Sequence, residues 1–393
     1  MAIINLYITT EKAITLDDVK DIHPKWTNRQ LNALSVLLAN LITYKKFWIR
    51  YESRNKANVI PRYNPLNIGH KVMLGVIEKL SEARLIEVIT GVGKYQQTED
   101  NPARQSEMSL TARGLHKCLK LGIKPDNITT IADEYYCILR KANSKSTKGI
   151  DYVDDDYSRH TEEVMRTYHD YLHQQTIKCM GDTFDYPKLN RIYRARGNTN
   201  KLLYGGRSSG YWMQVKKADR KNITINGQKT VGCDYASSTL NILYFIETGQ
   251  MLGKGVDGYK VDGIPRDIIK SMVNRMVNNK RKAECTIAFN YHIEKTATKD
   301  ERVFMKLTPL KPLDIQNRIL EHHSTIAKHF YKGDDYGQRI AWVESNVVFE
   351  VASQLAKMDV PVLTIHDEFI CKKEDEDLVW QSMYSTYVPF KDI

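Results

Sequence analysis

The sequence lacks the features that mark disulfide-rich, zinc-ribbon and membrane-spanning proteins. Its six cysteines lie far apart and form no CxxC pair, which argues against a disulfide framework and a zinc ribbon and fits a reducing compartment. No uninterrupted apolar run is long enough to span a bilayer, and the first residues show no basic segment followed by an apolar one. We therefore expect a cytosolic protein without membrane contact.

Internal repeats and low-complexity tracts are also absent, and 42% of the 393 residues are apolar, as in a globular protein with room for two or three domains. The formal charge of +11 at pH 7 is less ordinary. Such an excess of Lys and Arg favours a polyanionic partner, because binding to phosphates releases counterions. The alternative is a basic soluble protein that binds no nucleic acid.

The N-terminal part has the pattern of a compact helical unit that ends in a hairpin. Leucines recur at helical spacing in 27–48, apolar residues do so again in 66–83, and two short β-type runs flank a polar loop in 85–114. We interpret residues 1–125 as a winged-helix-like DNA-binding domain, which lays one helix in a DNA groove. A small helical cap with solvated charges is the alternative. The candidates for phosphate contacts are Arg50, Arg54, Lys56, Arg62, Lys71, Lys94 and Arg104.

Two further stretches have simple interpretations. TGVGK at 90–94 lacks the glycine spacing and the Ser or Thr of a phosphate-binding loop, so we interpret it as the turn of the wing. Residues 143–161 are polar and almost free of aliphatic side chains, which favours a linker, with an ordered crossing segment as the alternative. A cluster of acidic residues in this stretch is more typical of a solvated face than of a metal site: Asp151, Asp154, Asp155 and Asp156.

Two aspartates occupy comparable positions at the ends of apolar strands. Residues 227–245 are predicted to form a turn, a strand that ends at Asp234, and the start of a helix. The apolar run 360–365 leads into His366-Asp367-Glu368, a turn before a returning strand. Two-metal phosphoryl transfer needs such a carboxylate pair, since Mg²⁺ favours one or two carboxylates completed by phosphate oxygens and water. For the His-Asp-Glu stretch alone, a hydrogen-bonded turn is the alternative.

Polar residues before and between the aspartates complete the candidate site. A helix is predicted over 265–280, in which Arg266, Lys270, Asn274 and Asn278 share one face. Arg and Lys one turn apart can hold a triphosphate while the Asn side chains face the base or sugar; an ordinary amphipathic helix is the alternative. Upstream, a glycine pair that lets backbone approach a ligand precedes further polar candidates: Arg207, Ser208, Ser209 and Arg220.

Four stretches, which follow one another along the chain between about residues 202 and 375, resemble motifs of family A DNA polymerases. They also resemble those of related enzymes, the single-subunit RNA polymerases of phages. Gly206–Ser209 is similar to the family's T-G-R-x-S-S stretch, and Asp234–Ser237 looks like motif A. Arg266 and Lys270 match the R-x3-K of motif B, and His366–Glu368 matches motif C. The resemblance implies an α+β fold, with a right-hand polymerase after the winged-helix-like domain: a linker and thumb-like helices at 126–200, palm and fingers at 201–393.

The resemblance also implies residue roles. Asp234 and Asp367 would be catalytic and bind two Mg²⁺ ions, for which Mn²⁺ can substitute, assisted by the Tyr235 carbonyl. Lys270 would stabilise the triphosphate and donate a proton. The nucleotide-binding candidates are Arg266, Lys270, Asn274, Asn278, Tyr235 and Thr239. The primer- and template-binding candidates are Arg207, Ser208, Arg220, His366, Glu368, Arg54 and Lys71.

The sequence departs from the family where base and sugar are recognised. Asn274 and Asn278-Asn279 stand where motif B has an aromatic residue and Tyr-Gly, and Thr239 stands where DNA-synthesising members place a Glu that excludes the ribose 2′-hydroxyl. No second acidic cluster resembles a proofreading exonuclease. The combination is typical of a compact polymerase of a phage or mobile element, acting in a bacterial or phage-infected host cytosol.

The sequence therefore predicts a nucleotidyltransferase that extends a 3′-hydroxyl on a nucleic-acid template, with DNA template and primer and nucleoside triphosphates as partners. A DNA polymerase is favoured. The alternatives are an RNA-synthesising polymerase or primase, and a non-catalytic DNA-binding replication initiator in which the palm is a scaffold.

Overall fold

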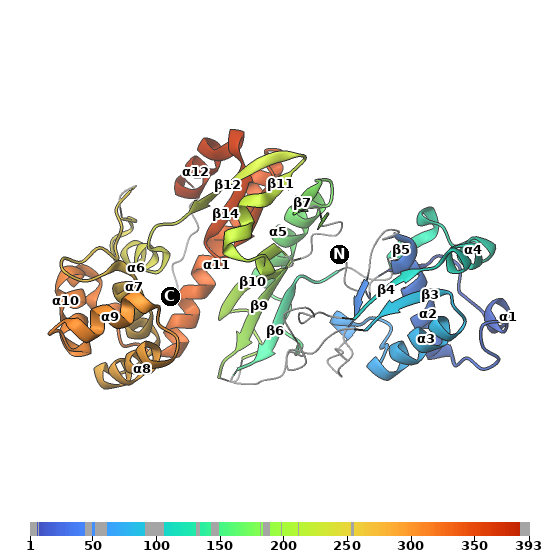
Figure 1. Ribbon diagram of the computed structural model, residues 1–393, viewed down its shortest axis with the longest axis horizontal. Helices are drawn as coiled ribbons and strands as arrows, with labels where there is room; N and C mark the ends of the chain where they lie inside the picture. Colours follow the sequence, from blue (N-terminus) through green and yellow to red (C-terminus); the bar gives the residue numbers. More distant parts are fainter. Residues whose placement is uncertain are drawn as a thin grey trace. The chain divides into compact units, whose positions relative to one another are not determined.

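The computed structural model describes residues 6, 8–43, 49–51, 61–90, 106–130, 134–142, 149–180, 182–183, 189–197, 199–210, 212–252 and 255–385. They form a mixed α+β structure (Figure 1). The chain divides into two compact units. Unit 1 comprises 1–154, 172–190 and 210–227, and unit 2 comprises 155–171, 191–209 and 228–393. No helix in the described part of the chain is long and apolar enough to cross a membrane.

The N-terminal part of unit 1 contains the predicted helices and strands. Helices α2 (Asn28–Thr43) and α3 (His70–Glu82) pack together over a sheet of strand order β2-β4-β3: β2 (Ile49–Tyr51), β4 (Ser106–Leu110) and β3 (Ile86–Ile89). Leu34, Leu38 and Leu41, whose spacing predicted α2, are buried in its core. The pattern did not predict β2, which pairs with β4, or α4 (Ala112–Lys120).

Smaller elements surround this core and complete unit 1. Near the chain start, α1 (Leu16–Val19) follows β1 (Ile8–Thr10), which pairs with β5 (Ile128–Thr130). The remaining strands of the unit are β6 (Cys137–Lys141), β7 (Ile177–Cys179), β8 (Asp182–Thr183) and β11 (Ile223–Ile225).

The predicted linker is partly ordered structure. Residues 143–148 lie outside the described residues. Asp151 and Asp154 form ion pairs with Arg62, at 2.7 and 2.9 Å. The Arg62 guanidinium also lies 4.0 Å from the centre of the Tyr152 ring. The Arg62 side chain is only 9% exposed, so the prediction that it contacts phosphate was wrong. Residues 156–161, also predicted as linker, begin helix α5 (Asp156–Leu172).

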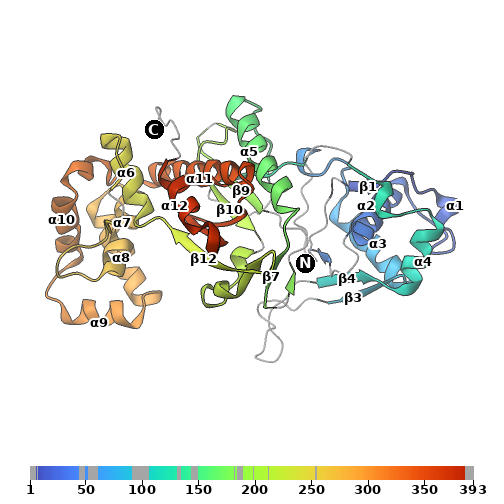
Figure 2. The same cartoon turned by 90° about the horizontal axis from the view of Figure 1, so that it is seen from above.

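Unit 2 contains an antiparallel sheet flanked by helices. The strand order is β13-β14-β12: β13 (Val362–Ile365), β14 (Glu368–Lys372) and β12 (Gln228–Asp234). Helices α11 (Asp334–Lys357) and α12 (Glu376–Ser385) pack on these strands (Figure 2). The Tyr168 hydroxyl of α5 donates to the Val362 carbonyl at 2.9 Å. Every residue of β13 is buried, as expected for a strand covered on both faces.

A second layer of unit 2 is helical. Helices α6 (Ser238–Thr248) and α7 (Arg266–Asn278) pack on α11, which runs on to the sheet (Figures 1 and 2). Helices α8 (Lys282–Lys295) and α10 (Pro312–His322) pack on α7, and α9 (Lys299–Leu307) packs on α8. The amphipathic helix predicted over 265–280 is confirmed as α7. Its apolar residues are all buried: Ile268, Ile269, Met272, Val273, Met276 and Val277.

A buried arginine hydrogen-bonds two further strands, β9 (Leu189–Ala195) and β10 (Gly205–Gly210), to helix α11. Arg191 in β9 is 2% exposed. It donates to the Gly206 carbonyl in β10 at 3.1 Å and to Ser345 and Asn346 of α11 at 2.8 and 2.6 Å. Gly206 has a φ of 82°, and a Cβ there would come within 2.8 Å of Ser345 Oγ. The glycine therefore makes room for protein packing, whereas the sequence predicted room for a ligand.

Candidate functional site

The strand register brings Asp234 and Asp367 to one edge of the unit 2 sheet. Asp234 ends β12 and lies opposite Glu368, the first residue of β14. His366 and Asp367 form the two-residue turn that joins β13 to β14, and His366 takes the left-handed backbone conformation with a φ of 56°. The backbone N–H of Tyr235 donates to the Asp367 carbonyl at 3.4 Å. Asp234 is exposed and Asp367 is partly exposed, so both carboxylates are accessible.

The residues beside the aspartates are held by packing. Tyr235 is buried, and its hydroxyl donates to the Met383 carbonyl of α12 at 2.6 Å; burial also raises the pKa of this phenol. On β12, a Cβ at Gly232 would come within 2.6 Å of the Glu368 carboxylate. The glycine therefore lets the Glu368 side chain lie across the strand.

A buried carboxylate on α11 connects three parts of the site. Glu344 accepts from Arg207 Nε at 2.8 Å and from the Ser238 hydroxyl, at the start of α6, at 3.0 Å. Its side chain is 5% exposed. Burial raises the pKa of Glu344, which Arg207 lowers and the nearby Asp367 raises further. Sequence reasoning missed this residue, since nothing local distinguishes one Glu in a long helix.

Arg207 remains half exposed although Glu344 holds it, so it can still contact a ligand. Side chains alternate along β10, and Ser208 is buried while Ser209 shares the exposed face with Arg207. Of the two serines predicted at the polar site, Ser209 therefore lies beside Arg207, whereas Ser208 faces the core. Arg220 belongs to unit 1, where its Nε donates to the Val215 carbonyl at 3.3 Å.

The polar face of α7 is exposed as predicted, with Arg266, Lys270, Asn274 and Asn278 all open to solvent. Arg266 makes an ion pair with Asp257 at 2.6 Å. Asn278 donates its amide to the Asn274 carbonyl at 2.6 Å and packs on Gly337 of α11, where a Cβ would lie 2.0 Å from its Oδ1. The face therefore offers two cations and two amides to a ligand.

Thr239, the predicted sugar-contacting residue, lies on α6 and hydrogen-bonds Tyr259, whose ring is 3% exposed. Burial raises the pKa of Tyr259 to about 12, so its hydroxyl stays protonated at neutral pH. Asp367 contributes to this shift, which indicates that Tyr259 lies within electrostatic reach of the sheet edge that carries Asp367. Sequence reasoning missed Tyr259 because the segment before α7 has no recognisable pattern.

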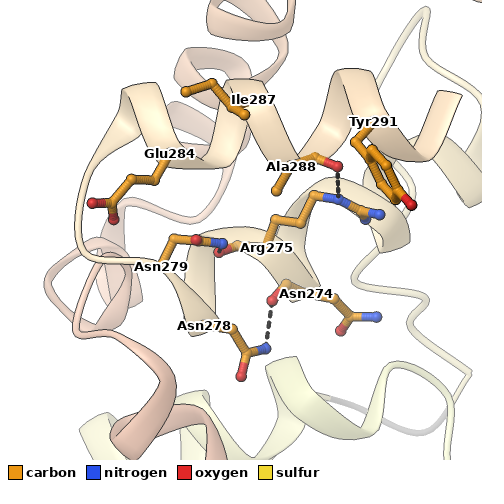
Figure 3. A pocket seen from close by; sticks show the side chains of 8 residues that line it. All are labelled: Asn274, Arg275, Asn278, Asn279, Glu284, Ile287, Ala288 and Tyr291. Atoms are coloured by element: carbon orange, nitrogen blue, oxygen red, sulfur yellow. Dashed lines mark hydrogen bonds between the residues drawn. The ribbon is translucent and has the colours of Figure 1, made fainter. Parts of the chain in front are cut away.

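A cavity of about 700 Å³ lies between α7 and α8 (Figure 3). Exposed and half-buried residues of α7 and α8, together with the residue after α7, line it: Asn274, Arg275, Asn278, Asn279, Glu284, Ile287, Ala288 and Tyr291. Arg275 braces the two helices, because its Nε donates to the Ala288 carbonyl at 3.1 Å. Tyr291 is 63% exposed, and an aromatic ring that packs so little on its own protein is available to a ligand. The cavity thus combines amides with an aromatic face.

The groups in the described part of the site that suit a magnesium ion are the carboxylates of Asp234 and Asp367. Within the described ranges, no group of three or more His, Cys, Asp or Glu side chains is arranged to hold a metal ion. Asp234, at the end of β12, and Asp367, in the turn before β14, provide two accessible carboxylates at one edge of the sheet. Because Mg²⁺ in phosphoryl-transfer sites takes its remaining ligands from phosphate and water, these residues fit the ion.

The DNA-contacting candidates of unit 1 are only partly described. Lys71 is exposed in the first turn of α3. Arg54, Lys56, Lys94 and Arg104 lie outside the described residues, as does most of the predicted wing turn at 90–94. Arg50 lies in β2, where only the backbone is described.

Comparison with known protein families, curated proteins and solved structures finds no match to this chain. Its candidate function therefore depends on the geometry described above and on the motifs in its sequence.

The buried carboxylate makes stability depend on pH. Because the pKa of Glu344 is raised in the folded protein, the folded state binds its proton more tightly than the unfolded state does. The stability contribution of Glu344 should be greatest below its unfolded pKa and fall as pH rises through the folded value. In Glu344→Gln this slope should be absent. Thermal unfolding of both proteins between about pH 4 and pH 8 measures it, and parallel curves would contradict the assignment.

Proposed function

We propose that the protein is a template-directed nucleic-acid polymerase that adds nucleotides to a 3′-hydroxyl. The observation that carries the proposal is the position of Asp234 and Asp367 at one edge of the unit 2 sheet, the first at the end of β12 and the second in the turn before β14. The same unit carries an exposed Arg and Lys face on α7. A structural scaffold has no need for two accessible like charges at one sheet edge, whereas phosphoryl transfer does. The sequence motifs, which resemble those of family A polymerases in the same order, support the proposal.

The carboxylates of Asp234 and Asp367, with the Tyr235 carbonyl, would hold the Mg²⁺ ions. When bound, these ions supply charge stabilisation at the transferred phosphate and lower the pKa of the attacking hydroxyl. The protein fixes the positions of these donors. The Tyr235 hydroxyl is bonded to the Met383 carbonyl, and the left-handed turn at His366 sets the direction in which the chain enters Asp367. Positioning of this kind is the main contribution of the protein in phosphoryl transfer.

The cations of α7 would bind the triphosphate. Lys270 and Arg266 lie one turn apart on the exposed face, and their positive charges attract the negative charge of a triphosphate. Lys270 would stabilise the charge that develops on the leaving pyrophosphate and protonate it.

The cavity between α7 and α8 would receive the base. Asn274 stands where the family has an aromatic residue, and across the cavity Tyr291 offers an exposed ring from α8 (Figure 3). Stacking on that ring stabilises any of the four bases, and the amides of Asn274 and Asn278 can bond base or sugar edges. The neighbouring helix thus provides the aromatic face that the helix carrying Arg266 and Lys270 lacks.

Unit 1 would bind duplex DNA. Its order of helix, strand, helix and hairpin, with strand order β2-β4-β3, resembles that of a winged helix and supports this proposal. Lys71 lies exposed at the start of α3. The excess positive charge of the chain supports a phosphate-rich partner.

DNA synthesis is favoured, and RNA synthesis is the second candidate. The observation in favour of RNA synthesis is Thr239, which is smaller than the Glu that DNA-synthesising members of family A have at this place. Thr239 is hydrogen-bonded to Tyr259, and no carboxylate stands at this position to exclude a ribose hydroxyl. Primer extension with dNTPs and NTPs in parallel, with and without primer, separates the two. Duplex binding without incorporation of either nucleotide would point to a non-catalytic initiator.

Asp234→Asn and Asp367→Asn should each reduce incorporation about 10³-fold or more, because metal stabilisation of the transition state is worth several kcal/mol. Duplex affinity should change little. Asp377→Asn, an exposed carboxylate of α12, is the matched control and should keep full activity. Near-normal incorporation by both site variants would refute the two-metal assignment.

Lys270→Ala should slow the chemical step ~10²-fold, since it removes a positioned proton donor and a charge at the leaving group. Single-turnover incorporation at saturating nucleotide measures this rate. Lys299→Ala, an exposed lysine on α9, should leave it unchanged. If Lys270→Ala alters only the KM for nucleotide, the residue binds substrate without acting in the chemical step.

Tyr291→Ala should raise the KM for the incoming nucleotide about 10-fold, the scale of one lost base-stacking contact, with a small effect on kcat. Tyr291→Phe keeps the ring and should behave like the unmodified protein. Equal losses in both variants would show that the hydroxyl, and not stacking, matters at this position.

A further inference from the structure

The carboxylate of Asp257, in the segment before α7, accepts hydrogen bonds from three different residues of unit 2. Asp257 Oδ2 accepts from Arg266 Nε at 2.6 Å. Its Oδ1 accepts from the Ser237 hydroxyl at 2.7 Å and from the Tyr259 backbone N–H at 3.0 Å. Neither the sequence motifs nor the proposed roles above account for this residue.

The bonds of Asp257 reach from the phosphate-binding face to the turn after Asp234. Ser237 follows Asp234 by three residues, is 3% exposed and takes a left-handed backbone conformation with a φ of 55° just before α6. Arg266 is the first residue of α7. One side chain therefore joins the end of the strand that presents Asp234 to the start of the helix that presents the cations.

The segment that carries Asp257 is itself tightly packed. A Cβ at Gly258 would come within 2.9 Å of the side chains of Leu240 and Leu252, so only glycine fits without displacing them. The Gly258 carbonyl also accepts from His323 Nε2 at 2.8 Å. Asp257 is thus anchored to α6 and to the residue after α10, and a rigid anchor is what a positioning role requires.

The contact with Arg266 leaves its phosphate-binding donors available. Asp257 takes the Nε–H, and the four Nη–H donors that bind phosphate in a fork are not used by this bond. The ring of Tyr259 lies 5.3 Å from the Arg266 guanidinium carbon and restricts it from a second side. Held at Nε and against the ring, the guanidinium loses little further rotational freedom when it binds an anion.

We infer that Asp257 is a positioning residue that fixes Arg266 for the outer phosphate of a nucleoside triphosphate and sets its place relative to Asp234. This inference rests on the proposed triphosphate role of Arg266. The competing possibility is that Asp257 opposes binding, because its negative charge occupies Arg266 and repels phosphate.

Binding of inorganic triphosphate by calorimetry tests the inference without requiring catalysis. The proteins compared are the unmodified chain, Asp257→Ala, Asp257→Asn, Arg266→Ala and the double variant Asp257→Ala/Arg266→Ala. Asp257→Asn keeps the shape of the side chain and remains informative if Asp257→Ala does not fold. Asp262→Ala removes an exposed carboxylate from the same segment and is the matched control.

Asp257→Ala and Asp257→Asn should weaken triphosphate binding about 3- to 10-fold, the scale of coupling between contacting residues. The Asp257 substitution should have no further effect once Arg266 is replaced, and Asp262→Ala should bind normally. In nucleotide incorporation the same variants should raise KM more than they lower kcat.

Three results would overturn the inference. Tighter triphosphate binding by Asp257→Asn would mean that Asp257 competes with phosphate for Arg266. An equal loss with and without Arg266 would mean that Asp257 only supports the local fold, and no change would mean that Arg266 needs no positioning. If the unmodified protein incorporates no nucleotide while the binding pattern holds, the polymerase proposal fails and the role of Asp257 stands.

Discussion

The candidate site depends on the register of one antiparallel sheet. Asp234 and Glu368 are paired residues of β12 and β14, and the turn before β14 contains Asp367. A shift of one residue would turn the side chains of β12 to the opposite face and separate the aspartates. Gly232 supports this register, because the Glu368 side chain lies across β12 where any other residue would meet it. The pairing of these two strands thus determines where the two acidic side chains lie.

Around this edge, the site is held by buried polar contacts more than by loops. Glu344 binds Arg207 and Ser238 from α11, and Arg191 binds the same helix from β9. These contacts connect α6, α11 and both strands of the β9–β10 pair, so the exposed charges rest on elements that have little freedom to move. Buried polar groups with their partners in place rigidify a core in this way.

The sequence predicted the elements with strong periodicity and missed those that depend on distant partners. The α7 face followed from a spacing of four, and the two aspartates followed from strand-end settings, since both signals are local. Arg62 was misassigned because its partners, Asp151 and Asp154, lie far along the chain in a stretch that resembled a linker. Glu344, Asp257, Tyr259 and Tyr291 have no local signature at all.

The contact between Asn278 and Gly337 has a consequence for how this protein can vary. A Cβ at position 337 would overlap the Asn278 amide, so any other residue there requires the exposed Asn278 side chain to move. That movement breaks the bond from the Asn278 amide to the Asn274 carbonyl. Substitutions at positions 337 and 278 should therefore be coupled, because a smaller residue at 278 makes room for a side chain at 337.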